Sequence, residues 1–121
     1  MPFSNNHHEI RQRARAFALR VFRLAEIMPA GVERRSICQQ LELHSCEMES
    51  RFRTAFQASS RRAHLACLAL ALEEADETVD CLELITRDRL LPADSAATLL
   101  AEARQLRTYL SAYYHSARMQ S

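Results

Sequence analysis

The sequence predicts an all-α protein that folds as an antiparallel up-down-up-down four-helix bundle. Residues that punctuate turns and sheets are rare, because the 121 residues include one glycine and three prolines. Apolar side chains also recur at alternating spacings of three and four in four successive segments, which places each set on one face of a helix. The length suits one hydrophobic core, so we expect a single domain over residues 1–121.

The first two helices are predicted from their stripes and from the breaks that follow them. The first is expected at residues 7–28, where Pro29 and Gly31 end it. The second is expected at residues 32–58 and fades at Ser59 and Ser60, which can serve as a break or as the next N-cap. The first stripe consists of Ile10, Ala14, Phe17, Val21, Leu24 and Met28. The second is more polar and includes Ile37, Leu41, Met48, Phe52 and Ala55.

The last two helices have the more regular stripes. The third is expected at residues 61–88, and the segment from Leu70 through Glu83 holds six acids and no base. The fourth is expected at residues 93–117, with Pro92 and Asp94 marking its start. The third stripe consists of Leu65, Leu68, Leu72, Ala75, Val79 and Leu82. The fourth consists of Ala96, Leu99, Ala103, Leu106, Leu110, Tyr113 and Ala117.

Short connections between four long helices favour antiparallel packing with crossing angles of roughly 20°. The third helix is apolar nearly all round from Leu65 to Leu72, and the first adds Ala18, Leu19 and Phe22 beside its stripe. Two interpretations of this extra apolar width remain open. It can form an interface between copies of the chain, or a four-helix core can simply need wide stripes.

The charged residues are balanced, with 16 bases, all arginine, against 15 acids. This balance argues against an indiscriminate polyanion binder. Asp76 lies at the edge of the third stripe, so we expect it to be partly buried with an arginine partner from the first helix. The alternative is a solvated acidic face. Residues expected to form ion pairs between helices or between subunits are Arg11, Arg15, Arg20, Arg23, Glu73, Asp76, Glu77 and Asp80.

A second set of arginines lies where the second predicted helix gives way to the third. Arg61 and Arg62 fall in a first helical turn, where positive charge opposes the helix dipole. They either receive an anion there or point to solvent at a small cost. Surface pairs of Glu47 with Arg51 and of Glu49 with Arg53 are a rival interpretation. The expected contacts for nucleic acid or a partner are Arg34, Arg35, Arg51, Arg53, Arg61 and Arg62.

No motif indicates catalysis, a metal or a cofactor. None of the five histidines follows a carboxylate by three residues, as the Glu-x-x-His of di-iron bundles requires. One glycine leaves no phosphate-binding loop. The four cysteines lack metal-site spacing and are expected in or near the core; they are Cys38, Cys46, Cys67 and Cys81. Because no signal sequence and no membrane span can be recognised, we expect a cytoplasmic protein. Because no catalytic motif can be recognised, we expect that it is not an enzyme.

The acid-rich third helix carries a family resemblance. The run Glu73-Glu74-Ala75-Asp76-Glu77, followed by Leu82-Glu83-Leu84, resembles the four-helix-bundle proteins first known as products of intervening sequences in 23S ribosomal RNA genes. The accessory variability protein of diversity-generating retroelements belongs to the same group. Supporting matches are Gln40, Leu41, Phe52, Arg53, Ala55 and Ser60.

The resemblance implies an up-down bundle that assembles into a ring, pentameric in known members. In the retroelement branch it implies a basic accessory protein that binds nucleic acid and a reverse transcriptase. This chain differs in having Arg51 and Cys81 where the family often has Asn and Trp, and in being nearly neutral. From the resemblance we expect a homo-oligomeric accessory protein that binds RNA, DNA or a nucleic-acid enzyme such as a reverse transcriptase. The alternative is a structural protein-protein interaction module that binds no nucleic acid.

Overall fold

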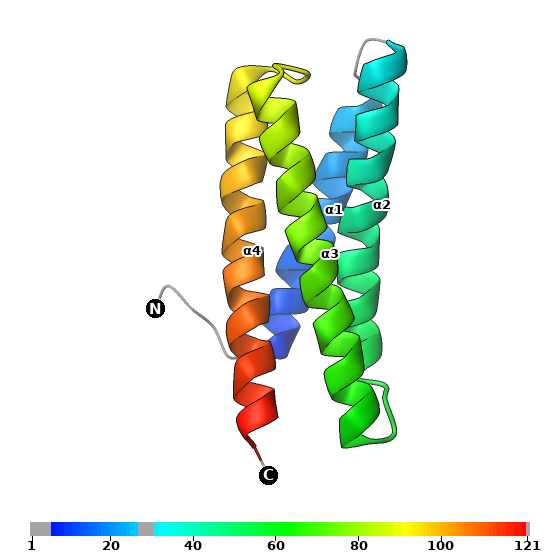
Figure 1. Ribbon diagram of the computed structural model, residues 1–121, viewed down its shortest axis with the longest axis vertical. Helices are drawn as coiled ribbons and strands as arrows, with labels where there is room; N and C mark the ends of the chain where they lie inside the picture. The colour runs from blue at the N-terminus through cyan, green and yellow to red at the C-terminus, as the bar shows by residue number, and fades with distance from the viewer. Residues whose placement is uncertain (1–5, 27–30, 121) are drawn as a thin grey trace.

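The computed structural model describes residues 6–26 and 31–120, apart from the side chains of residues 32–34. Four helices, α1 (His7–Glu26), α2 (Val32–Ala55), α3 (Arg61–Arg87) and α4 (Ala93–Met119), run alternately up and down along one long axis (Figure 1). The predicted all-α four-helix bundle is confirmed, and every helix begins at the predicted residue. Three ends differ from the prediction, because α2 ends at Ala55 instead of 58, α3 ends at Arg87 instead of 88 and α4 continues to Met119 instead of 117. The predicted end of the first helix at Met28 and Pro29 lies outside the described residues.

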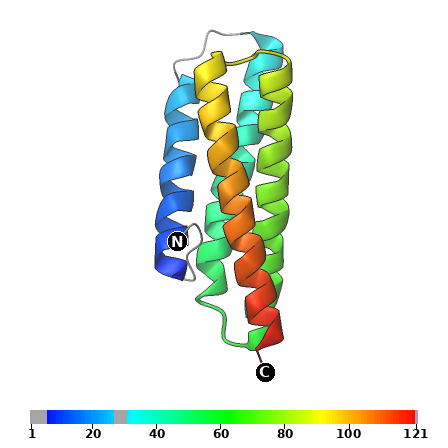
Figure 2. The same ribbon diagram turned by 90° about the vertical axis from the view of Figure 1, so that its left-hand side faces the viewer.

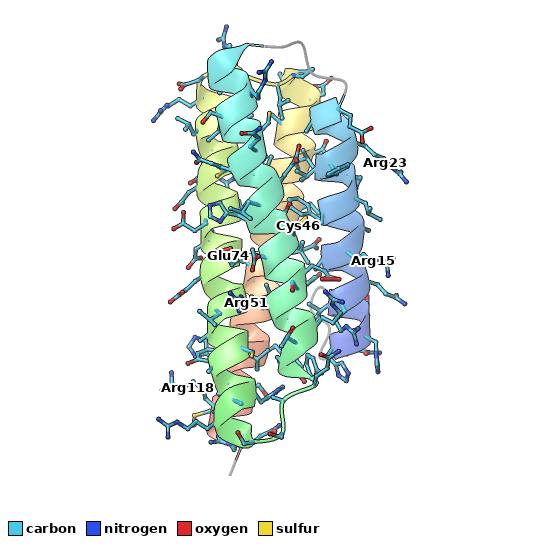
Figure 3. The ribbon with its side chains drawn as sticks, turned by 90° about the vertical axis from the view of Figure 1, so that its right-hand side faces the viewer. Arg15, Arg23, Cys46, Arg51, Glu74 and Arg118 are labelled. Carbon is cyan, nitrogen blue, oxygen red and sulfur yellow. The ribbon has the colours of Figure 1, made fainter. Side chains whose placement is uncertain are left out.

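The helices occupy the four corners of the bundle in chain order. α1 packs against α2 and α4, and α3 packs against the same two helices, whereas α1 and α3 lie diagonally across the core and are not backbone neighbours. Figure 2 shows α4 between α1 and α3, and Figure 3 shows α2 between them from the opposite side. The outer faces of α1 and α3 therefore point in opposite directions.

The described residues of the predicted stripes meet along the bundle axis around one core, with Leu24, Leu65 and Leu72 only partly buried at its edge. Ile10, Phe17, Phe52, Leu82 and Leu106 are all at most 1% exposed, and each helix contributes to the same cluster. Burial of such side chains is the main source of the stability of a bundle of this size. No described helix has an apolar stretch that could cross a membrane.

Two buried hydroxyls are satisfied within their own helices. Ser45 donates a hydrogen bond to the carbonyl of Glu42 at 3.1 Å, and Thr78 donates one to the carbonyl of Glu74 at 2.8 Å. The cysteines follow their prediction only in part. Cys38 and Cys81 are buried and Cys67 is half-buried, but Cys46 is exposed because it lies on the outer side of α2.

The two ends of α3 show how the chain makes turns with so little glycine. Ser60 is the N-cap, as predicted, and its hydroxyl accepts a hydrogen bond from the amide of Ala63 at 3.1 Å. At the other end Arg89 has φ 54, a left-handed conformation that usually requires glycine. The amide of Leu90 then donates to the carbonyl of Ile85 at 3.0 Å, which closes the last turn.

Candidate functional site

Positive charge collects at one end of the bundle, which we call the basic end. It is formed by the start of α1, the end of α2, the start of α3 and the end of α4, at the bottom of Figure 1. Residues 50–72 hold four arginines and no acid, and residues 105–120 hold two arginines and no acid. The acids of α3 begin only at Glu73 and continue towards the other end. The near-neutral net charge thus hides a separation of charge along the bundle.

The titration of His7 reports the same positive surroundings. Burial lowers the pKa of His7 most, and the nearby charges of His8, Arg11 and His64 lower it further. The His7 ring stacks on the Phe56 ring, with centroids 4.1 Å apart and planes 14° from parallel. The start of α1 is therefore joined to the end of α2 beside several positive groups of the basic end.

The predicted contact arginines of α2 at this end form surface ion pairs. Arg51 lies 3.4 Å from Glu47, and Arg53 lies 3.4 Å from Glu49, each one helical turn away. Both arginine side chains are nearly half exposed. Such pairs contribute little to stability and leave the guanidinium groups accessible.

The two arginines at the start of α3 differ in their contacts: the Arg61 side chain is hydrogen-bonded, and the Arg62 side chain, within the described chain, is not. Nη2 of Arg61 donates to the carbonyls of Ala117, Arg118 and Gln120 at 3.2, 2.9 and 2.6 Å, so it caps the end of α4. Arg62 is exposed and has neither an ion pair nor a hydrogen bond among the described residues. The unfavourable interaction of Arg61 with the dipole of its own helix is thus offset by its hydrogen bonds to the carbonyls at the end of α4.

The two remaining predicted contact residues lie elsewhere. Arg34 and Arg35 are in the first turn of α2, and Arg35 is exposed. Arg51 follows Arg35 by 16 positions, which at about 1.5 Å of rise per residue is about 24 Å of helix. The structure therefore separates these two arginines from the basic end, and the side chain of Arg34 is outside the described part.

The prediction that first-helix arginines meet third-helix acids inside one subunit is wrong for the described residues. The reason is the diagonal placement of α1 and α3. Arg20 instead pairs with Glu102 of α4. Asp76 is exposed rather than partly buried, and it lies 4.0 Å from Arg107 of α4. Pairing between subunits stays a prediction.

The other members of this predicted set have no ion pair among the described residues. Figure 3 shows Arg15 and Arg23 extending outward from α1, on the side away from α3. Arg15 and Arg53 also line a polar groove of about 510 Å³ between α1 and α2, together with Arg11 and His8. The residues without an ion pair are Arg11, Arg15, Arg23, Glu73, Glu77 and Asp80.

Sequence reasoning missed several features of the basic end. Phe56, His64 and Tyr113 gather there, and Nδ1 of His64 lies 2.6 Å from the carbonyl oxygen of Ala55. Arg118 lies over the Tyr114 ring at 5.5 Å. The absence of acids from residues 50–72 and 105–120 was a visible signal, because an up-down bundle brings those segments to one end. Within the described chain, no three His, Cys, Asp or Glu side chains converge as metal ligands.

The comparisons agree with this architecture. The sequence model of the 23S rRNA-intervening sequence protein family matches residues 6–112. The chain belongs to that family. The resemblance predicted from the third helix is thereby confirmed at the level of the family.

A solved structure shows the same fold. It is a crystal structure of a protein with unknown function from the S23 ribosomal protein family of Bacteroides thetaiotaomicron. It superposes with a TM-score of 0.80 at 22% identity, over 90% of this chain and 97% of that one. At that identity the likeness shows the fold alone. No curated protein matches the chain.

Proposed function

We propose that this intervening-sequence family member is a non-enzymatic, homo-oligomeric accessory protein that binds nucleic acid through the basic end. The separation of charge along the bundle carries this proposal. Phosphates are attracted by clustered positive charge rather than by net charge, and Lys or Arg contacts release counterions when they form. At the basic end the exposed Arg62 has no side-chain partner among the described residues, and Arg51 and Arg53 have only weak surface pairs.

A gel mobility shift with structured RNA and with single-stranded DNA tests the proposal. Binding should be clear at about 50 mM salt and much weaker at about 200 mM, because each phosphate contact adds to the salt dependence. Arg62→Gln should weaken binding and reduce the salt slope by about 1. Arg35→Gln is the matched control, since it removes an exposed arginine from the opposite end. No shift at the lower salt rejects nucleic-acid binding.

Assembly of several copies is supported by the outer faces of α1 and α3. Glu73 and Glu77 are one turn apart on α3, and neither has an ion pair among the described residues. Like charges at this spacing destabilise a helix by about 0.2–0.5 kcal/mol per pair. Arg15 and Arg23 extend from the opposite side of the bundle. A head-to-tail contact between copies brings the two faces together, and its repetition gives a ring, a pentamer for example, or a filament.

Light scattering on a charge-neutralised variant tests this contact. Glu73→Gln with Glu77→Gln should lower the mass of the assembly at a fixed protein concentration. Glu9→Gln with Glu47→Gln is the matched control, because those acids form pairs within their own helices. An assembly that is unchanged by the first pair contradicts a contact through the acidic face.

The family resemblance extends the proposal to a nucleic-acid enzyme, such as a reverse transcriptase, as a protein partner. A reverse transcriptase gene with sequence repeats beside the gene for this chain would support that extension. If assembly depends on Glu73 and Glu77 while no nucleic acid binds, the second candidate applies. The protein is then a structural interaction module whose copies associate through the arginine face of α1 and the acidic face of α3.

A further inference from the structure

A hollow of about 620 Å³ opens at the basic end between the α2–α3 connection and the last turns of α4. Its walls include Phe56 from the end of α2, His64 from α3 and Tyr113 from α4. None of the described residues that line it is acidic. The lining also includes Arg61, so aromatic rings and a positive charge meet at one concave site. A plain hydrophobic groove or a solvated arginine surface would provide only one of the two.

The aromatic wall is held in place by packing. The Phe56 ring meets the Tyr113 ring edge-on, with centroids 5.7 Å apart, and meets the His64 ring in the same way at 5.1 Å. Behind them Phe52 is fully buried and contacts both Phe56 and Tyr113, at 5.2 and 5.8 Å. Rings that are fixed before a ligand arrives lose little conformational entropy on binding, so the wall is pre-organised for stacking.

Uncommitted polar groups surround the rings. The hydroxyls of Ser59, Ser116 and Tyr113 line the hollow, and none forms a hydrogen bond within the described residues. The Tyr113 hydroxyl is a neutral donor at physiological pH, as tyrosine ordinarily is, and burial raises its pKa further. Arg61 forms part of the rim while it caps α4. Neutral donors and acceptors beside aromatic faces suit the edge of a planar heterocycle.

We propose that this hollow receives an unpaired base of single-stranded nucleic acid, which deepens and rests on the proposed function. The base stacks against the Phe56 and Tyr113 wall, and the flanking phosphates face the positive charge of the basic end. A base can enter a concave site only when it is free of its own stack, so a paired duplex is excluded from the hollow. Stacking of this kind tolerates any of the bases, because every base has a π face.

Intrinsic fluorescence gives a direct test, because the chain has three tyrosines and no tryptophan. Titration with a single-stranded oligonucleotide of about 12 nucleotides at about 50 mM salt should quench tyrosine emission. The same sequence as a duplex should bind with little quenching. Tyr113→Phe keeps the ring and removes the hydroxyl, so it should still bind the single strand, more weakly than the unchanged protein, and lose most of the quenching. Tyr114→Phe, the neighbouring residue outside the lining, should retain both.

Affinity measurements complete the test. Ser116→Leu fills part of the hollow from an exposed position, so the fold should be retained, as circular dichroism can verify. It should weaken single-strand binding about fivefold or more and leave duplex binding unchanged, given the usual contribution of one stacked base.

If single strand and duplex bind equally and no quenching depends on Tyr113, the proposal that the hollow binds an unpaired base is rejected. The proposed function, binding of nucleic acid at the basic end, is then unaffected. Absence of binding to either form overturns both.

Discussion

Arg61 and Arg62 are adjacent arginines in one helical turn, and the structure predicts opposite effects for their removal. Arg61 donates to three carbonyls at the end of α4, the nearest 2.6 Å away, whereas Arg62 has no partner among the described residues. Hydrogen bonds from a charged group contribute about 1.5–3 kcal/mol when sheltered. For the exposed Arg61 we reduce this to about 1 kcal/mol, because water competes for the same carbonyls.

The expected shift can be measured by thermal unfolding followed by circular dichroism. An unfolding entropy of about 2.1 cal/mol/K per residue gives about 0.25 kcal/mol/K for 121 residues. Arg61→Ala should therefore lower Tm by about 4 °C. Arg62→Ala should leave Tm unchanged or raise it by about 1–2 °C, because it removes a positive charge from a helix N-terminus.

Salt and protein concentration provide the controls for this comparison. Both variants are measured at one protein concentration, so that any self-association affects them equally. The loss from Arg61→Ala should shrink in about 1 M salt, where exposed charge interactions are screened. Equal Tm values for the two variants would show that the cap at the end of α4 contributes nothing.

Three further predictions concern the turn after α3, the histidine at the start of α1 and the cysteines. Arg89→Gly should stabilise the protein by about 0.5–1 kcal/mol in urea titrations, because Arg89 has a left-handed φ of 54; a loss of stability would contradict a relieved backbone. The lowered pKa of His7 means that the unfolded state binds a proton more readily, so stability should fall as the pH drops below about 6.5, and less so in His7→Gln. Iodoacetamide at about pH 8 should modify exposed Cys46 before Cys81, whose pKa burial raises to about 11; equal rates would contradict this order.

Much of the fold could be predicted because its determinants are local. The spacing of Leu68, Ala75, Val79 and Leu82 fixes the buried side of α3, and all four are at most 2% exposed. Ser60 has the residue type that an N-cap prefers. Period and capping chemistry act within a few residues, so they can be read from the sequence.

The candidate site was less predictable because it depends on which helices are neighbours. The α1 arginines and α3 acids are complementary in sequence, yet a diagonal arrangement keeps them apart, and Arg20 finds Glu102 instead. The contact of Arg61 with the end of α4 joins segments 56 residues apart or more. No local pattern reports such pairings, which follow from the order of the helices around the core.

The way α1 is held has a consequence for local opening. α1 contributes four buried side chains against eight from α3, and it packs more closely on α2 than on α4. Its seam with α4 is bridged by polar contacts, such as Arg13 with the Tyr109 hydroxyl at 3.4 Å. A helix with fewer buried groups opens at a lower free energy, so amide protons of α1 should exchange with solvent before those of α2, α3 and α4. If the outer face of α1 also binds a second copy, amide exchange in α1 should slow as the protein concentration rises. The free energy of opening α1 is then coupled to the size of the assembly.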